Sequence, residues 1–524
     1  MKRNALLYSG SLLFLLCACK KPITNSGMVT PTGDLKSVIS RASIDNYITN
    51  SIKSKGDFKW AEASDEQVWS ALSQSDKVLS VGYKPAGWAA ADVYTNIHTI
   101  NVQSKAWQEA KDAVLQLIWE EERKAQPNLK IEKLEVWPEK YLPVMCVQVQ
   151  SLSTISKLRQ SNLVRYAEPI GYNYKAEDQV KETGDKLKST LGCTGALAHF
   201  GNLLLNNDYS VISPLAKVSW NYSHHRIEQS WPVSSGKGIK VMVVDTGCSL
   251  NQEGLNGSFN QGASYGRTME HLVTLPRDIL MGVVPYGPQE TPQDMCGHGT
   301  TMAGVIGAPR GTRGGACGIA YNCDLVTVRA SADVILDESR EKKGVADAFD
   351  IAANRDDIKI ISMSMGYPFY ISQVADAVQN AINRGKLVFC AAGTSNEWTN
   401  WLWVAFPASM PDVNAVTGIK DNLRERCSVC HEGDKVGFVV VMEKGATGLH
   451  VLSLAMNGEN PSIVGGSSVA TASMAGMAAM VWSRYPKKSA SEIVDILKAS
   501  AVNPDHNSNW GAGIVKMDKA LGID

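Results

Sequence analysis

A continuous apolar run that ends in an aspartate constrains the fold of this 524-residue chain more than any other feature. Residues 241–244 read Val-Met-Val-Val, and Asp245-Thr-Gly follows at once. Apolar, β-branched residues without polar alternation are typical of a strand buried on both faces of a parallel sheet. Functional side chains of such sheets gather beyond the carboxyl ends of the strands. We therefore expect an α/β fold with a mainly parallel sheet, and a functional carboxylate at Asp245.

Chain length and charge limit the number of domains and the kinds of partner that we expect. Domains usually have about 100–200 residues, so a chain of this length is expected to form two or more of them. Lys+Arg and Asp+Glu are equal, at 52 each. Proteins that bind nucleic acid need an excess of positive charge to displace counterions, so we expect no nucleic-acid partner. Composition leaves the oligomeric state open.

The first residues read as an export signal. Lys2 and Arg3 precede a mostly apolar stretch at residues 6–16, which is too short to span a bilayer. The sequence Leu-Cys-Ala-Cys that ends at Cys19 resembles the lipobox of bacterial lipoproteins, which are cut before a lipid-bearing cysteine. We expect residues 1–18 to be removed and the lipid on Cys19 to anchor the exported chain to a membrane of the bacterial cell envelope or surface. The alternative is an ordinary secretory signal, which also leads to export.

The next residues divide into a tether and a small domain. Residues 19–60 begin rich in Ser, Thr, Gly and Lys, and are expected to form a tether. Residues 61–175 are expected to form an αβ domain, in which Ser104 caps a long helix with apolar residues on one face. The other elements expected in this domain are a strand at 144–149, a short helix at 153–160 and a strand at 164–168.

Two further segments carry chemically useful residues in unusual settings. His298 stands between two glycines, which let the backbone approach a substrate closely, and residues 301–306 are expected to continue as a helix. Ser468 lies among small residues at the start of an apolar helix that includes 478–482. An oxyanion formed at Ser468 would face backbone N–H groups and the positive end of the helix dipole.

Together with Asp245, these segments resemble the subtilisin-like serine proteases, in which the catalytic residues follow the order Asp, His, Ser. The resemblance covers about residues 218–524 and is strengthened by four shorter matches. These matches are at residues 361–366, 406–408, 413–418 and 511–521. The resemblance implies a serine endopeptidase with a triad of Asp245, His298 and Ser468.

The implied reaction proceeds through an acyl-enzyme on Ser468. His298 would accept the serine proton and return it to the leaving amine, while Asp245 holds the imidazole in the required tautomer. The expected partners are protein or peptide substrates, and no cofactor is expected for catalysis. Structural calcium occurs in the family, but no acidic loop here is specific enough to assign a metal site.

The resemblance also implies positions for substrate and oxyanion. The family's oxyanion asparagine follows Ala-Ala-Gly, where this chain has Thr394, with Asn396 two residues later. Either side chain, or backbone donors alone, remains an option, and a peptide-binding module without catalysis is the alternative function. Residues 361–366 resemble the edge strand that pairs with the substrate backbone. The residues expected to contact substrate are Ser364, Met365, Gly366, Ala391, Ala392 and Gly393.

The region before the catalytic resemblance suggests an inhibitor. Residues 142–169 resemble in pattern the inhibitory prodomain that precedes many secreted subtilisin-like proteases. Residues 176–217 would then connect the prodomain-like domain to the catalytic domain. A permanently attached accessory domain is the alternative.

Cysteines offer a second set of possibilities. Of 11 cysteines, nine remain when Cys17 and Cys19 of the signal segment are set aside, so at least one thiol is left unpaired. Export favours disulfides, and Cys317 and Cys323 flank a short predicted loop across which they are candidates to pair. Residues 427–431 read C-x-x-C-H, which fits c-type haem attachment. Zinc, a disulfide or free thiols are the other options at this motif, and a disulfide or free thiols are favoured.

Overall fold

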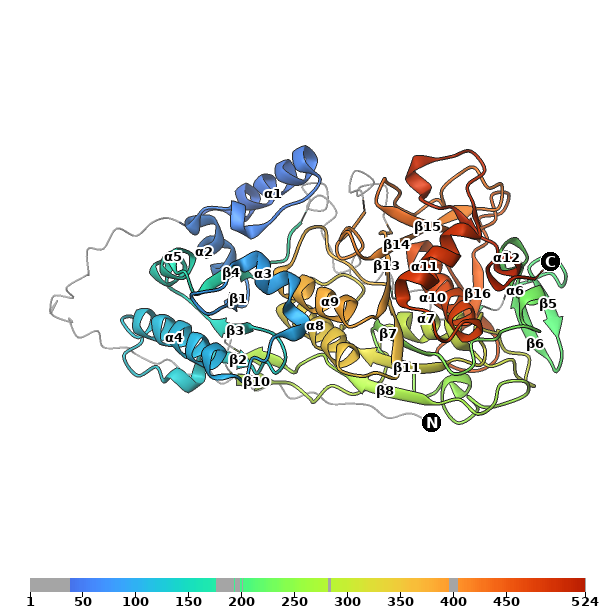
Figure 1. Ribbon diagram of the computed structural model, residues 1–524, viewed down its shortest axis with the longest axis horizontal. Helices are drawn as coiled ribbons and strands as arrows, with labels where there is room; N and C mark the ends of the chain where they lie inside the picture. The colour runs from blue at the N-terminus through green and yellow to red at the C-terminus, as the bar shows by residue number, and fades with distance from the viewer. Residues whose placement is uncertain are drawn as a thin grey trace, which may run out of the picture. The chain divides into compact units, whose positions relative to one another are not determined.

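The computed structural model describes residues 38–175, 193, 198–199, 201–280, 284–394 and 404–523 (Figure 1). Several predictions therefore lie wholly or partly outside the described residues: the signal at 1–18, the lipid-bearing Cys19, the first part of the tether, much of the connecting segment at 176–217 and the oxyanion candidate Asn396. None of the helices in these described ranges combines the length and the apolar character needed to span a membrane.

The N-terminal domain contains a four-stranded antiparallel sheet with the order β2-β3-β1-β4 (Figure 1). The helix expected after Ser104, the helix near 153–160 and both expected strands are present. The strands are β1 Val78–Tyr83, β2 Glu135–Trp137, β3 Val144–Gln148 and β4 Val164–Pro169. The helices are α2 Asp65–Ser73, α3 Ala90–Thr95, α4 Lys105–Glu122 and α5 Leu152–Gln160, with short 3₁₀ turns at Trp60–Glu62, Ile97–Thr99 and Ile131–Lys133.

The predicted tether is wrong over its second half, because helix α1 spans Arg41–Lys55. Ser40 caps the helix by accepting a hydrogen bond from Ser43 N. Ile44, Ile48 and Ile52 recur at a spacing of four and are buried in the core of the N-terminal domain. This apolar stripe holds α1 on the domain, and its spacing of four with polar residues between was a helix signal that the prediction of a tether missed.

The catalytic region is built on a nine-stranded, mainly parallel sheet with the order β18-β19-β15-β14-β13-β12-β7-β11-β8 (Figure 1). Only the β18–β19 pair is antiparallel, and the predicted strand is β7, whose residues 241–245 are all buried. The strands are β7 Lys240–Asp245, β8 Met269–Val273, β11 Asp324–Arg329, β12 Ile358–Met363, β13 Leu387–Ala391, β14 Asn414–Lys420, β15 Val436–Glu443, β18 Ala501–Val502 and β19 Ile514–Val515.

Helices pack on both faces of this sheet. Met242 and Val244 of β7 share a core with α8 (Ser339–Ala353) and α9 (Ser372–Asn383). Val241 and Val243 share the opposite core with α7 (His298–Gly307) and α10 (Gly466–Arg484). Strand β7 is therefore buried on both faces, as its apolar run predicted.

The remaining helices are α6 Ile227–Ser230, α11 Ala490–Ala499 and α12 Met517–Leu521, with 3₁₀ turns at Trp220–His225, Glu253–Leu255 and Ser508–Trp510. The remaining strands form three two-stranded pairs: β5 Tyr209–Ile212 with β6 Ala216–Ser219, β9 Asp278–Leu280 with β10 Val284–Tyr286, and β16 Val451–Leu454 with β17 Pro461–Val464.

Strand β12 is not an edge strand, contrary to the prediction for residues 361–366. It lies between β13 and β7 inside the sheet. Residues 364–366 continue beyond its carboxyl end, where Gly366 N donates a hydrogen bond to Val334 O. A short apolar strand has the same sequence character at the centre and at the edge of a parallel sheet, so its position was not readable from the sequence.

Disulfides form between other cysteines than the pair expected. Cys317 and Cys323 are both buried with free thiols, and Cys317 Sγ points to the carbonyl oxygen of Gly318 instead. Cys427 and Cys430 form a disulfide, so their sulfurs are not free to bind haem or zinc. The second disulfide, Cys193–Cys296, closes a separation of 103 residues.

Candidate active site

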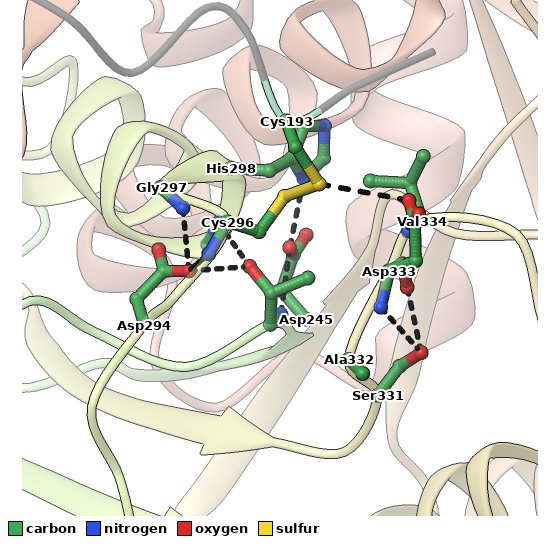
Figure 2. Close-up of a disulfide and its surroundings, with 12 residues drawn as sticks. Cys193, Asp245, Asp294, Cys296, Gly297, His298, Ser331, Ala332, Asp333 and Val334 are labelled. Atoms are coloured by element: carbon green, nitrogen blue, oxygen red, sulfur yellow. Dashed lines mark hydrogen bonds and ion pairs between the residues drawn. A yellow bond between two sulfur atoms is a disulfide. The ribbon is translucent and has the colours of Figure 1, made fainter. Parts of the chain in front are cut away.

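Asp245 and His298 meet at the carboxyl end of strand β7. Asp245 is the last residue of the strand and is fully buried, and His298 is the first residue of α7. Asp245 Oδ1 accepts hydrogen bonds from His298 Nδ1 (2.7 Å) and from Thr246 N (2.8 Å) (Figure 2). This contact fixes the ring orientation of His298 and leaves its other nitrogen, Nε2, to act on a substrate or nucleophile.

Glycines allow the two segments to approach each other. Gly297, just before His298, has a φ of 88°, a conformation that side chains disfavour. A Cβ on Gly299 would lie 2.3 Å from the carbonyl oxygen of Gly247. Both glycines are therefore required for the Asp245–His298 contact, which gives the Gly-His-Gly pattern a steric explanation.

The charges around His298 favour its protonated form. Burial alone would lower the pKa of His298, but the charge and hydrogen bond of Asp245 raise it, and the charges of Asp294 and Asp333 add to this effect. The net result is a His298 pKa above the ordinary value for histidine. A base must be neutral to accept a proton, so activity that depends on His298 is expected to rise with pH through this elevated pKa.

Ser468 lies in the first turn of α10. Its Oγ donates to Ser364 O (3.3 Å), and Ser364 Oγ donates to Ser468 O (3.0 Å). Within the described ranges no hydrogen bond joins Ser468 to His298, and catalytic hydrogen bonds are often made only when substrate is bound. The neighbouring Ser467 is fully buried, whereas Ser468 is partly exposed. Of the two serines, Ser468 is thus the one that a substrate can reach.

The expected substrate-binding segments lie on two sides of the start of α10. Ser364 contacts Ser468, and Gly393 N donates to Ser467 Oγ (3.1 Å). The side chains of Met365, Ala391 and Ala392 are buried, so these three residues can offer only their backbones to a substrate.

Residues 334–336 run alongside the segment that was expected to pair with substrate. Leu336 N donates to Gly366 O (3.2 Å), and Gly366 N donates to Val334 O (3.2 Å). These backbone groups of Gly366 are therefore already paired within the chain. A substrate strand has to pair with other groups or displace residues 334–336.

Thr394 is the oxyanion candidate that the structure describes. Its Oγ1 accepts a hydrogen bond from Ser467 N (3.2 Å) and lies 3.0 Å from Ser467 Oγ. The side chain is exposed, and Gly466, with a φ of 85°, provides the space for it, since a Cβ there would lie 2.7 Å from Thr394 Oγ1. The hydroxyl of Thr394 thus contacts Ser467, the residue before Ser468, at the amino end of α10.

Two features of the site were missed in the sequence. Asp294, four residues before His298, is fully buried and accepts hydrogen bonds from Gly297 N (2.6 Å) and Cys296 N (3.0 Å) (Figure 2). The Cys193–Cys296 disulfide places Cys193 beside the site, where its Sγ lies 3.6 Å from an oxygen of Asp333 (Figure 2). The Asp-x-x-x-His-x-Thr pattern was the available signal for Asp294. No signal in the sequence indicated that Cys193 pairs with Cys296.

One acidic cluster has the composition of a metal site. Ligand oxygens of Glu139, Asp347 and Asp350 lie within 4.8 Å of one another. Lys343 forms ion pairs with Glu139 (3.2 Å) and with Asp347. The lysine ammonium already supplies positive charge there, so the cluster gives no reason to assign a metal.

Comparison with known proteins identifies the family of the chain. The alkaline protease of Alkalihalobacillus alcalophilus is 29% identical over 317 residues, which are 60% of this chain and 73% of that protein. Subtilisin DY of Bacillus licheniformis is 28% identical over 290 residues, 54% of this chain and 91% of that protein. The crystal structure of MycP1 with the N-terminal propeptide removed has a TM-score of 0.45 and 21% identity, covering 58% of this chain and 96% of MycP1. Residues 236–513, more than half of the chain, match the Subtilase family, and the chain therefore belongs to this family of serine-type endopeptidases.

Proposed function

We propose that this subtilase cleaves proteins or peptides through an acyl-enzyme, with Asp245, His298 and Ser468 as its catalytic triad. The hydrogen bond of 2.7 Å between buried Asp245 and His298, at the carboxyl end of strand β7, carries the proposal. A neutral serine hydroxyl is a poor nucleophile and needs a base at hand. His298, held in one tautomer by Asp245, is suited to take the proton of Ser468 and pass it to the leaving amine.

The surroundings of Ser468 suit the charge that develops during the reaction. Attack on a carbonyl places negative charge at the amino end of the 19-residue helix α10, where backbone N–H groups lack helical partners. All groups required for acyl transfer are side chains or backbone of the chain itself, so the proposed chemistry uses no cofactor.

The test is hydrolysis of an internally quenched peptide that is blocked at both termini. An endopeptidase cleaves such a peptide, and mass spectrometry of the products locates the bond. A p-nitrophenyl ester should give a burst of nitrophenol equal to the enzyme concentration, because the acyl-enzyme accumulates. Tight binding of the peptide without cleavage would instead identify a peptide-binding module.

The oxyanion donor is predicted to be one of two side chains. If Thr394 donates to the oxyanion, Thr394→Val should lower kcat about a hundred- to a thousand-fold with little change in KM. If Asn396 has that role, Asn396→Ala should do so, and Thr394→Val should have a small effect. Steady-state kinetics of both variants decide between them. A near-parental kcat in both variants would mean that backbone N–H groups alone stabilise the oxyanion.

The N-terminal domain is proposed to act as an intramolecular inhibitor. It docks on helix α9, where Arg165 forms a buried ion pair with Asp376 (2.7 Å), and Tyr166 Oη donates to the same carboxylate (2.9 Å). At the first turn of α9, Ser372 N (3.0 Å) and Ser372 Oγ (2.6 Å) donate to Glu168. Attachment in the same chain raises the effective concentration of the domain at this surface.

The end of the same domain reaches the substrate-binding segments. Tyr367 Oη donates to Tyr172 O (2.7 Å), and Asn173 Nδ2 donates to Asp337 (2.7 Å). Tyr367 adjoins Gly366, and Asp337 adjoins Leu336. Tyr172 and Asn173 thus contact residues beside the place where a substrate strand would bind, which supports inhibition over a remote accessory role.

We expect a separate fragment of residues 38–175 to inhibit the isolated catalytic region 218–524 at low micromolar concentration or below. The fragment starts at residue 38 because α1 belongs to the domain core. Arg165→Ala in the fragment should weaken inhibition more than a hundredfold, because leaving Asp376 buried without its partner costs about 3–5 kcal/mol. Arg159→Ala is the matched control, because Arg159 pairs with Asp65 within the N-terminal domain. A folded catalytic region that ignores the parental fragment would contradict the proposal.

Export and lipid anchoring are also part of the proposal. They rest on the apolar stretch at residues 6–16 and the Leu-Cys-Ala-Cys sequence that ends at Cys19. Cells that produce the chain and are fed an alkyne fatty acid should label it in the membrane fraction. Cys19→Ala should remove the label, and retention of the label in this variant would rule out Cys19 as the site.

A further inference from the structure

Asp294 lies at the centre of the contacts between the two segments that carry Asp245 and His298. Its carboxylate is fully buried. Oδ1 accepts from Cys296 N (3.0 Å) and Gly297 N (2.6 Å), the two residues that lead into His298. Oδ2 accepts from Thr300 N (2.9 Å) in the first turn of α7. One carboxylate therefore holds the backbone on both sides of His298, and Figure 2 shows the side of Cys296 and Gly297.

Two threonine hydroxyls extend this network to the segment after Asp245. Thr246 Oγ1 donates to Asp294 Oδ1 (2.9 Å) and accepts from Gly299 N (3.0 Å). Thr300 Oγ1 donates to Asp294 Oδ2 (2.7 Å) and accepts from Ser249 N (2.8 Å). Each hydroxyl thus donates its O–H to Asp294 and accepts an N–H from the opposite segment with its oxygen. The two crossed contacts tie the Asp245 segment to the His298 segment.

Only an ionised carboxylate satisfies all of these donors. Every group that faces the two oxygens is an N–H or an O–H donor. An asparagine has one acceptor oxygen and would direct its NH₂ group at backbone N–H groups in either orientation. A threonine hydroxyl could accept a hydrogen bond from this NH₂ group only by turning its own O–H away from residue 294. The NH₂ group and the N–H of the opposite segment would then both donate to the same hydroxyl oxygen.

From this network we infer that Asp294 is a positioning residue for the reaction: it sets the placement of His298 relative to Asp245 without touching the substrate. The inference rests on the proposed function of the triad. A displacement of about 1 Å between catalytic groups costs on the order of a hundredfold in rate. Loss of the Asp294 network therefore acts on the chemical step more than on substrate binding.

Asp294 also belongs to the charges that surround His298. Burial lowers the pKa of His298, and the charges of three carboxylates raise it: Asp245 at the end of β7, which contacts the ring, Asp294 before α7, and Asp333 after β11. Arg329 of β11 is a cation in contact with this network: it donates to Thr246 O (3.1 Å) and pairs with Glu290 (2.8 Å). Removing the charge of Asp294 should lower the His298 pKa.

The experiment compares Asp294→Asn with the parent in the full chain, using the blocked peptide. We expect kcat to fall about ten- to a hundredfold while KM changes less than about threefold. The acid limb of the kcat/KM profile should move to lower pH. Asp208→Asn is the matched control, since Asp208 is also buried and accepts from a backbone N–H, that of Leu204 (2.8 Å), and pairs with Lys444 outside the site. It should leave kcat and the acid limb unchanged.

An unchanged kcat, or an unmoved acid limb, in folded Asp294→Asn would overturn the inference. If this variant does not fold, Thr246→Val takes its place, because it removes one crossed contact and leaves the backbone donors of Asp294 intact. It should lower kcat about tenfold, and a parental kcat would overturn the inference. Absence of hydrolysis in the parent itself would instead contradict the proposed function, so the two failures are distinguishable.

Discussion

Ser468→Ala is expected to lower kcat for peptide hydrolysis by about a million-fold, the loss known for removal of the serine from a subtilisin triad. The alanine has no hydroxyl to form the acyl-enzyme, and the remaining groups can only bind and polarise the substrate. The measurement is the rate of cleavage of the blocked peptide at saturating concentration. KM should change little, because the oxygen makes its bond to substrate only during the reaction.

The neighbouring serine provides the control. Ser467 is fully buried, and its Oγ accepts from Gly393 N, so Ser467→Ala should have a far smaller effect on kcat. If Ser467→Ala abolishes hydrolysis and Ser468→Ala does not, the assignment is wrong by one residue. If neither replacement matters, the observed activity comes from a different mechanism.

Asp245→Asn is expected to lower kcat about ten-thousand-fold. The amide keeps the shape of the side chain but can turn an N–H towards His298 Nδ1, which fixes the wrong tautomer and leaves the imidazolium without a counter-charge. The carboxylate of Asp245 is also the main group that raises the His298 pKa against burial. Neutral His298 is the active form, so removal of this charge should shift the acid limb of residual activity to lower pH.

A second strand-terminal aspartate serves as its control. Asp324 begins β11, where it pairs in register with Lys240 at the amino end of β7, opposite the catalytic end. Asp324 is partly exposed and its carboxylate accepts from Thr268 N and Oγ1, so Asp324→Asn removes a strand-terminal carboxylate away from the site and should leave kcat near the parental value. A comparable loss of activity in both variants would attribute the effect of Asp245→Asn to folding.

The parts of the fold that were predicted from sequence depend on local patterns. Strand β7 was found because residues 241–244 are apolar without alternation, which reports burial on both faces. His298 was found because Gly297 and Gly299 meet steric demands that only glycine satisfies, and such demands mark the sequence at the position itself. Ser468 was found because small residues at the start of a helix are needed for close approach of other backbone segments.

The parts that were missed depend on contacts between distant residues. The inner position of β12 follows from its pairing with β7 and β13, which the strand's own residues do not reveal. Cys296 pairs with a cysteine 103 residues away, and no spacing in the sequence indicates that pairing. The Asp-x-x-x-His-x-Thr pattern marks Asp294, but its contact with Thr246, 48 residues away, is visible only in the structure. Helix α1 is an exception, because its three isoleucines at a spacing of four were a local signal that the prediction of a tether missed.

Mapping the serine that reacts with a fluorophosphonate tests the central claim most directly. Fluorophosphonates react with serines that an adjacent base activates, so the adduct reports the nucleophile and its activation together. The full chain is treated with the probe, digested and sequenced by mass spectrometry, with His298→Ala as a parallel sample. We predict one adduct on Ser468 that is absent in His298→Ala. An adduct on another serine, or no adduct on a chain that cleaves peptides, would contradict the assignment of the triad.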